Sequence, residues 1–178
     1  DLILCDSTES GDTPVSLRTC AERLKPGQEC LYYMTGESRA ALQASPHLEA
    51  FRDKGYEVLL LSDPVDEIWT QSVTEYQGTK LQAAGRGEVD LGSEEEKKES
   101  QKARDEKTKQ YGPLLDAVKD ALAEYVKEVR LSGRLTSSPA CLVIDPHDIS
   151  PQMERMMRMM GQEAPRVKRI LELNPDHP

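Results

Sequence analysis

The sequence predicts an α/β protein in which helices cover a largely parallel sheet, followed by a smaller α+β region. Residues 56–61, reading YEVLLL, form a near-continuous apolar run, as expected for a strand covered by helices on both faces of a parallel sheet. Strand-like and helix-like patterns alternate on either side of that run, which is typical of βαβ units. A long charged stretch, residues 93–110, then interrupts the pattern and indicates a connector between two regions.

The first region, residues 1–91, is expected to alternate between strands and helices. Strands are predicted at residues 30–34, 56–61 and 79–83, and residues 1–5 have the character of a strand end. Helical spacing or start signals predict helices at residues 17–24, 37–42 and 46–54. A further helix opens at Asp63-Pro64, contains Ile68 and Trp69, and closes at Gly78.

Residues 92–111 are expected to form a charged helical connector. Between residues 93 and 110 the only apolar side chain is Ala103, and six acidic residues balance six basic ones. Strong helix formers without a hydrophobic stripe predict a solvated helix. A nucleic-acid-binding tail would instead carry one sign of charge.

The second region, residues 112–178, starts where Gly112-Pro113 is expected to begin a new helix. Apolar spacing predicts that helix over residues 114–125, followed by strands at 129–131 and 140–144. Residues 167–173 alternate between aliphatic and charged side chains, which predicts a strand with Lys, Arg and Glu facing solvent.

Five of the six methionines lie between Met153 and Met160. In a helix, Met153, Met156, Met157 and Met160 would share one face. Spacing alone favours a stripe buried against the protein's own sheet. The alternative is a binding surface, because flexible thioethers adapt to many partner shapes.

Composition and charge exclude several classes of protein. The formal net charge of −9 argues against nucleic-acid binding, and no apolar run of 18 residues predicts a membrane span. The three histidines lack metal-ligand spacing, and the four scattered cysteines indicate reduced thiols in the cytoplasm. The first and last residues suggest a fragment of a longer protein.

No sequence motif assembles a catalytic site. The chain has no glycine-rich phosphate loop and no strained nucleophile turn. Asp63, Asp66 and Glu67 follow the strongest strand, where ligands bind in α/β proteins, but acids in a first helical turn are also favoured by the helix dipole. An independent α/β ligand-binding domain is therefore the alternative, and Trp69 is either a packed anchor or an exposed binding residue.

Several segments resemble the bacterial members of the 90-kDa heat-shock protein family of molecular chaperones. They are LYYMTGES (31–38), SPHLEAFRDKGYEVLLLSDPVDE (45–67), VKEVRLSGRLTSSPACLV (126–143), QMERMM (152–157) and LELNPDHP (171–178). The resemblance implies that residues 1–91 form the last, three-layer α/β/α part of the family's middle domain. Residues 112–178 would be a truncated C-terminal domain without its dimerisation helices.

The resemblance also implies a function. The chain would bind partly unfolded client proteins as part of a cytoplasmic, ATP-dependent, homodimeric chaperone of the stress response, with possible co-chaperones. The implied client-binding residues are Ile149, Met153, Met156, Met157 and Met160, with a second patch at Glu67, Ile68 and Trp69. ATP and magnesium would belong to the parent protein, so the fragment itself is expected to be no enzyme and to hold no cofactor. A structural connector without a client site is the alternative.

Overall fold

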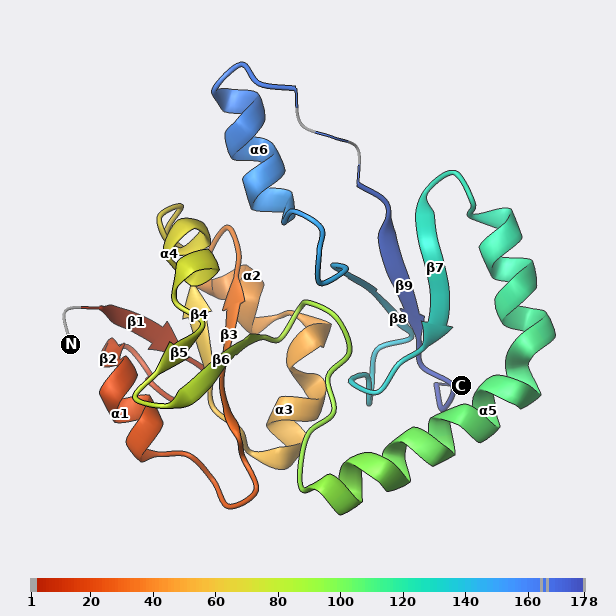
Figure 1. The fold of residues 1–178 in the computed structure, drawn as a ribbon, viewed down its shortest axis with the longest axis horizontal. Helices are drawn as coiled ribbons and strands as arrows, with labels where there is room; N and C mark the ends of the chain where they lie inside the picture. Colours follow the sequence, from red (N-terminus) through yellow and green to blue (C-terminus); the bar gives the residue numbers. More distant parts are fainter. Residues whose placement is uncertain (1–2, 164, 166, 178) are drawn as a thin grey trace. The chain divides into compact units, whose positions relative to one another are not determined.

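A computed structural model describes residues 3–163, 165 and 167–177, so the predicted domain limits at residues 1 and 178 lie outside the described residues. The chain forms two compact units, residues 1–84 and 85–178 (Figure 1). The division falls before the boundary expected at residue 91 because residues 85–91 bond to the second unit. The Gly87 N–H donates to the Ile144 carbonyl at 2.8 Å, and the Ile144 N–H donates to Gly85 at 3.1 Å.

The first unit is built on a six-stranded sheet in the order β2-β1-β4-β3-β6-β5. The central strands β4 (Val58–Leu61), β3 (Cys30–Thr35) and β6 (Thr79–Ala83) are parallel, whereas the outer pairings are antiparallel. The outer strands are β1 (Leu4–Ser7), β2 (Val15–Ser16) and β5 (Glu75–Tyr76). Strand β1 partly overlaps the strand end predicted at residues 1–5, of which residues 1 and 2 lie outside the described part.

Helices of the first unit pack against alternate residues of β4. On one face, Leu59 and Leu61 pack with Leu17 and Cys20 of α1 (Leu17–Glu22) and with Trp69 of α4 (Asp66–Ser72). Val58 and Leu60, which alternate with them, are also buried. The remaining helices are α2 (Arg39–Gln43), the 3₁₀ turn η1 (Pro46–Leu48) and α3 (Glu49–Lys54). Phe51 of α3 meets Tyr32 of β3 edge-on, with the ring centroids 4.8 Å apart.

The second unit contains one long helix, α5 (Glu94–Ala121), and a three-stranded sheet. Ser93 and Glu96 form a reciprocal capping box at the start of α5. The prediction that Gly112-Pro113 begins a new helix is wrong, because α5 continues through Pro113 and bends in this part of its course (Figure 1). Tyr111, Leu115 and Val118 pack against the sheet on both sides of the proline, and this packing stabilises the continuous helix.

The sheet of the second unit has the order β7-β9-β8. Strand β9 (Arg169–Leu173) runs parallel to β7 (Val126–Leu131) and antiparallel to β8 (Ala140–Val143). Leu171 and Leu173 face the cluster that α5 covers, whereas Ile170 belongs to a separate cluster with Leu135, Cys141 and Val143. Both faces of β9 are therefore packed. Helix α6 (Pro151–Met159) lies in the connection between β8 and β9.

Candidate functional site

Helix α6 has well-defined signals at both ends. The Ser150 hydroxyl accepts the Met153 N–H at 3.0 Å, and Pro151 occupies the first helical turn. Beyond the last turn, Gly161 adopts a φ of 73°, which favours glycine. The Gly161 N–H donates to Arg158 and the Gln162 N–H to Met157, so two terminal carbonyls are satisfied. The sequence thus encodes a short helix that carries the methionines.

The methionine face consists of Ile149, Met153, Met156, Met157 and Met160. None of the residues of α6 is buried. Met153, Met156, Met157 and Ile149 are half-buried, whereas Met160 is 60% exposed and Met159, which lies off the face, is 87% exposed. The stripe therefore does not form the interior of the second unit, although spacing alone favours a core.

The first turn of helix α6 is attached to β9. Arg169 Nη1 donates to the Ile149 carbonyl at 2.8 Å, and Arg169 Nη2 forms an ion pair with Glu154. Arg158 lies 3.8 Å from the other oxygen of Glu154. The carboxylate of Glu154 thus joins the helix to the strand.

The second predicted patch lies on α4 in the first unit, and its three residues have different environments. Glu67 is buried at 6% exposure, Trp69 is half-buried against the core, and Ile68 is 54% exposed. Val65, which precedes α4, is also exposed. Of the three residues named from the sequence, Ile68 presents the most apolar surface to solvent.

The acids near α4 take part in local structure. Asp66 accepts the Trp69 indole N–H at 2.7 Å and the Asp63 backbone N–H at 2.9 Å. Both oxygens of that carboxylate are thus engaged within the helix start. This arrangement favours the structural interpretation of the acidic cluster over a ligand site.

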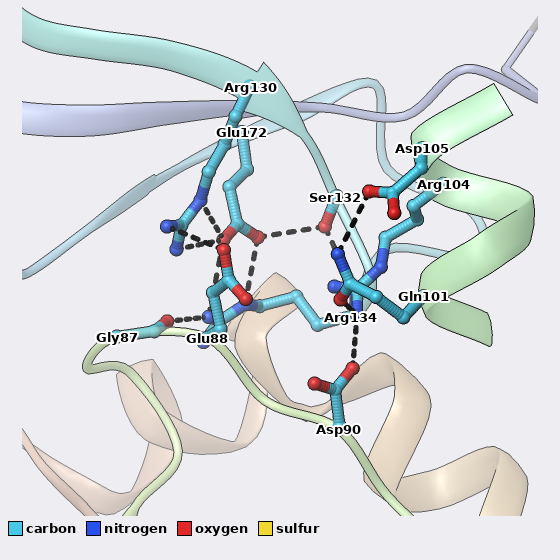
Figure 2. Close-up of polar contacts among 10 residues, drawn as sticks. All are labelled: Gly87, Glu88, Asp90, Gln101, Arg104, Asp105, Arg130, Ser132, Arg134 and Glu172. Atoms are coloured by element: carbon cyan, nitrogen blue, oxygen red, sulfur yellow. Dashed lines mark hydrogen bonds and ion pairs between the residues drawn. The ribbon is translucent and has the colours of Figure 1, made fainter. Parts of the chain in front are cut away.

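A buried polar cluster centred on Glu172 was not foreseen from the sequence (Figure 2). Arg130, Ser132 and Arg134 converge on the Glu172 carboxylate. Ser132 Oγ donates at 2.9 Å, Arg134 Nε at 2.9 Å and Arg130 Nη2 at 2.8 Å. Arg134 and Glu172 are 1% and 2% exposed. The prediction that the glutamate of this strand faces solvent is therefore wrong, because β9 is covered on both faces.

The same cluster holds the chain that enters the second unit. Arg134 donates to the Gly87 carbonyl, and Arg130 reaches Glu88 at 3.3 Å. Arg104 of α5 forms an ion pair with Asp90 and packs closely over Gly133. Residues 87–90 are therefore fixed to β7, to the turn after it and to α5 (Figure 2).

Burial and charge act in opposite directions on Glu172. Burial alone would raise the pKa of its carboxyl, but Arg134 and the hydrogen bonds from Arg130, Arg134 and Ser132 outweigh burial and lower the pKa. The ionised form is therefore stabilised in the folded state. The cluster has the geometry of a structural support. Arg130 and Glu172 are paired residues on the parallel strands β7 and β9, a register that the sequence alone does not give.

The cysteines are all free thiols. Burial, followed by nearby carboxylates, raises the pKa of Cys5 to about 12. Burial and Glu57 raise the pKa of Cys20 to about 12 as well. These two thiols are poor nucleophiles at neutral pH and serve as core residues.

Comparison with known proteins identifies the family. The family model described as Hsp90 protein matches residues 1–178. The chaperone protein HtpG of Geobacter sulfurreducens is 58% identical over 179 residues, which cover 100% of this chain and 28% of that protein. HtpG of Rhodococcus jostii is 55% identical, covering 97% and 27%, and HtpG of Frankia casuarinae is 52% identical, covering 99% and 27%. The chain thus spans little more than a quarter of the length of these relatives.

These matches overturn two predictions. The resemblance predicts a fragment without the family's ATPase domain, and hence no enzyme and no cofactor. That expectation is wrong, because the Hsp90 model and the HtpG relative match the whole of residues 1–178. The matches therefore give no ground for separating this chain from the ATPase of the family. The expectation that ATP and magnesium belong only to the parent protein is wrong for the same reason.

A magnesium site would require a cluster of metal-ligating side chains. Among residues 3–163, 165 and 167–177, no group of three or more His, Cys, Asp or Glu side chains could hold a metal ion. In the same part of the chain, no helix is long and apolar enough to cross a membrane.

Both the coverage of this chain and the sequence identity of the matches support the family assignment. A family model accounts for the whole sequence, and curated relatives share 52% to 58% of its residues. This chain belongs to the Hsp90 family of heat-shock chaperones.

Proposed function

We propose that this chain contacts partly unfolded client proteins through the methionine face of α6. The observation that carries the proposal is the exposure of this helix, in which no residue is buried. A purely structural connector would bury such a stripe. Unbranched thioethers can repack around many apolar segments, which suits a chaperone that must accept clients of different sequence.

The inferred mechanism is a weak and reversible burial of apolar surface. Client segments would cover Met153, Met156 and Met157, while Arg155 and Arg158 keep the opposite side of the helix hydrated. Each contact would contribute little, so one sequence could replace another on the same surface. Ile68 of α4 would offer a smaller apolar contact of the same kind, with Trp69 supporting it from the core.

The position of the chain within a whole chaperone belongs to the same proposal. Residues 1–91 would form the last part of the middle domain and residues 112–178 the start of the C-terminal domain, with the helix between them as connector. The sequence resemblance supports this placement. The whole protein would act as a cytoplasmic homodimer that responds to stress, together with co-chaperones.

A titration with a permanently unfolded protein tests the proposal. The chain carrying Met153→Ser and Met157→Ser should remain folded and bind the unfolded protein about tenfold more weakly, because two apolar contacts are lost. Leu114→Ser is the matched control, since Leu114 is 55% exposed on α5 and lies outside the proposed surface. Equal affinities in the wild type and the methionine variant would reject α6 as the client surface. Unfolding of the variant would show instead that the methionines stabilise the fold.

A further inference from the structure

The described polar contacts that helix α6 makes with β9 lie at the start of the helix. Its residues are exposed or half-buried, so packing alone gives the helix a weakly defined direction. At its start, however, Ser150 is only 4% exposed, and the preceding residue Ile149 offers its carbonyl to Arg169. The helix is therefore fixed at one end, while the methionines extend toward the other.

We propose that Arg169 is a positioning residue for the methionine face. This inference rests on the proposed client-binding function. Arg169 begins β9, whose backbone is held between β7 and β8. From this rigid strand its guanidinium donates to the Ile149 carbonyl through one nitrogen and pairs with Glu154 through another. One planar group thus holds the chain at two points, which are the Ile149 carbonyl just before α6 and the Glu154 carboxylate in its first turn.

The two contacts of Arg169 fix the direction of α6 as well as its distance from β9. Ile149 is itself part of the methionine face, and Glu154 follows Met153 directly. Side-chain exposures of 13% for Arg169 and 14% for Glu154 shield the pair from water more than an ordinary surface ion pair. A lysine ammonium has three donors but no rigid planar fork, so it holds two acceptors in a less defined geometry.

A graded series of substitutions at Arg169 tests this role. Client affinity for the permanently unfolded protein should fall in the order Arg169, Arg169→Lys, Arg169→Met, with the last variant about three- to tenfold weaker. Glu154→Gln should also weaken binding. The double variant Arg169→Met/Glu154→Gln should lose less than the sum of the two single losses, because both act through one contact. Arg155→Met, on an exposed residue of the same helix, is the matched control.

Methionine methyl NMR supplies a readout that a general loss of stability would not reproduce. Labelled methyl groups should report a changed environment in the five methionines of residues 153–160 when Arg169 is replaced. Methyl signals of Leu115 and Leu131, from labelled leucine in the core of the second unit, should stay unchanged and serve as the internal reference.

The outcomes separate this inference from the proposed function. If Met153→Ser/Met157→Ser weakens client binding but Arg169→Met leaves both affinity and the methionine signals unchanged, the positioning role is wrong and the client surface stands. If neither variant alters binding, the proposed function itself fails. A shift of the Leu115 and Leu131 signals in Arg169→Met would show unfolding of the second unit. Glu154→Gln, which removes only one charge, then decides the question by the same affinity and methyl measurements.

Discussion

Two arginine–glutamate contacts of the second unit have opposite surroundings. Glu172 is 2% exposed and receives three side chains from β7 and the turn after it, whereas Glu154 joins an exposed helix to Arg169 at the surface of β9. The first contact lies inside the packed sheet and supports the fold. The second supports a surface whose own residues contribute little packing. By our proposal, burial determines whether this chemical pair stabilises a unit, as at Glu172, or orients a surface, as at Glu154.

Removing the buried carboxylate should give the largest effect on stability. Glu172→Ala leaves the buried Arg134 and the half-buried Arg130 without their shared acceptor, which costs roughly 3–5 kcal/mol in the free energy of unfolding. Urea denaturation followed by circular dichroism measures the change. Glu128→Gln, an exposed glutamate of β7, is the control and should leave the urea midpoint in place. A loss below about 1 kcal/mol for Glu172→Ala would mean that the cluster does not support the fold.

Acidification should reduce the stability that the Glu172 carboxylate contributes. Because the folded-state pKa of Glu172 lies below its ordinary value of 4.5, the stability it contributes is complete above that value and declines as the pH falls through the folded pKa. The difference in unfolding free energy between the wild type and Glu172→Gln should therefore be constant above about pH 5.5 and shrink below about pH 4.5. A difference that grows on acidification would contradict the lowered pKa.

Ser132→Ala should weaken the cluster without destroying it. The hydroxyl donates to Glu172 and accepts the backbone N–H groups of Arg134 and Leu135, each at 3.1 Å. Losing these bonds should cost about 1–2 kcal/mol, because the charged pair remains. Thermal or urea unfolding of Ser132→Ala beside Ser137→Ala, an exposed serine of the following loop, would measure the difference. Equal stability of the two variants would show that the hydroxyl is dispensable.

A substitution on α6 should have the smallest effect on stability. Met159 is 87% exposed, so Met159→Ser should change the unfolding free energy by less than about 0.5 kcal/mol. The same urea experiment tests it. A loss comparable to that of Ser132→Ala would place α6 among the elements that support the fold. It would contradict the contrast between the buried Glu172 cluster and the exposed helix α6.

Most elements of the first unit could be predicted because their sequence patterns match their environments. The prediction of a helix that closes at Gly78 is wrong, because α4 ends at Ser72 and β5 pairs with β6 around Gly78, which has a φ of 81°. The apolar run that ends in β4 is buried on both faces, and glycines end helices where a left-handed residue is required, as at Gly55 with a φ of 65°. Local patterns failed in the second unit. Pro113 did not end α5, because packing of the helix on both sides of the proline outweighed its local preference.

The candidate site could be predicted only in part. Spacing places the methionines on one face of a helix, but whether that face is exposed depends on what packs against it, which periodicity does not report. The buried role of Glu172 escaped for a related reason. Alternation along residues 167–173 predicts two faces but not that residues 87–90, far away in the sequence, cover the second one. Glu67 is buried likewise, although its neighbour Ile68 faces solvent.

The exposure of α6 has a further chemical consequence. A thioether in contact with solvent is oxidised to the sulfoxide, which is polar and chiral, and specific reductases reverse the reaction. Met159 and Met160, at 87% and 60% exposure, are the most accessible thioethers of the helix. A surface that owes its adaptability to sulfur is thereby also a surface whose polarity an oxidant can change, one side chain at a time and without altering the sequence.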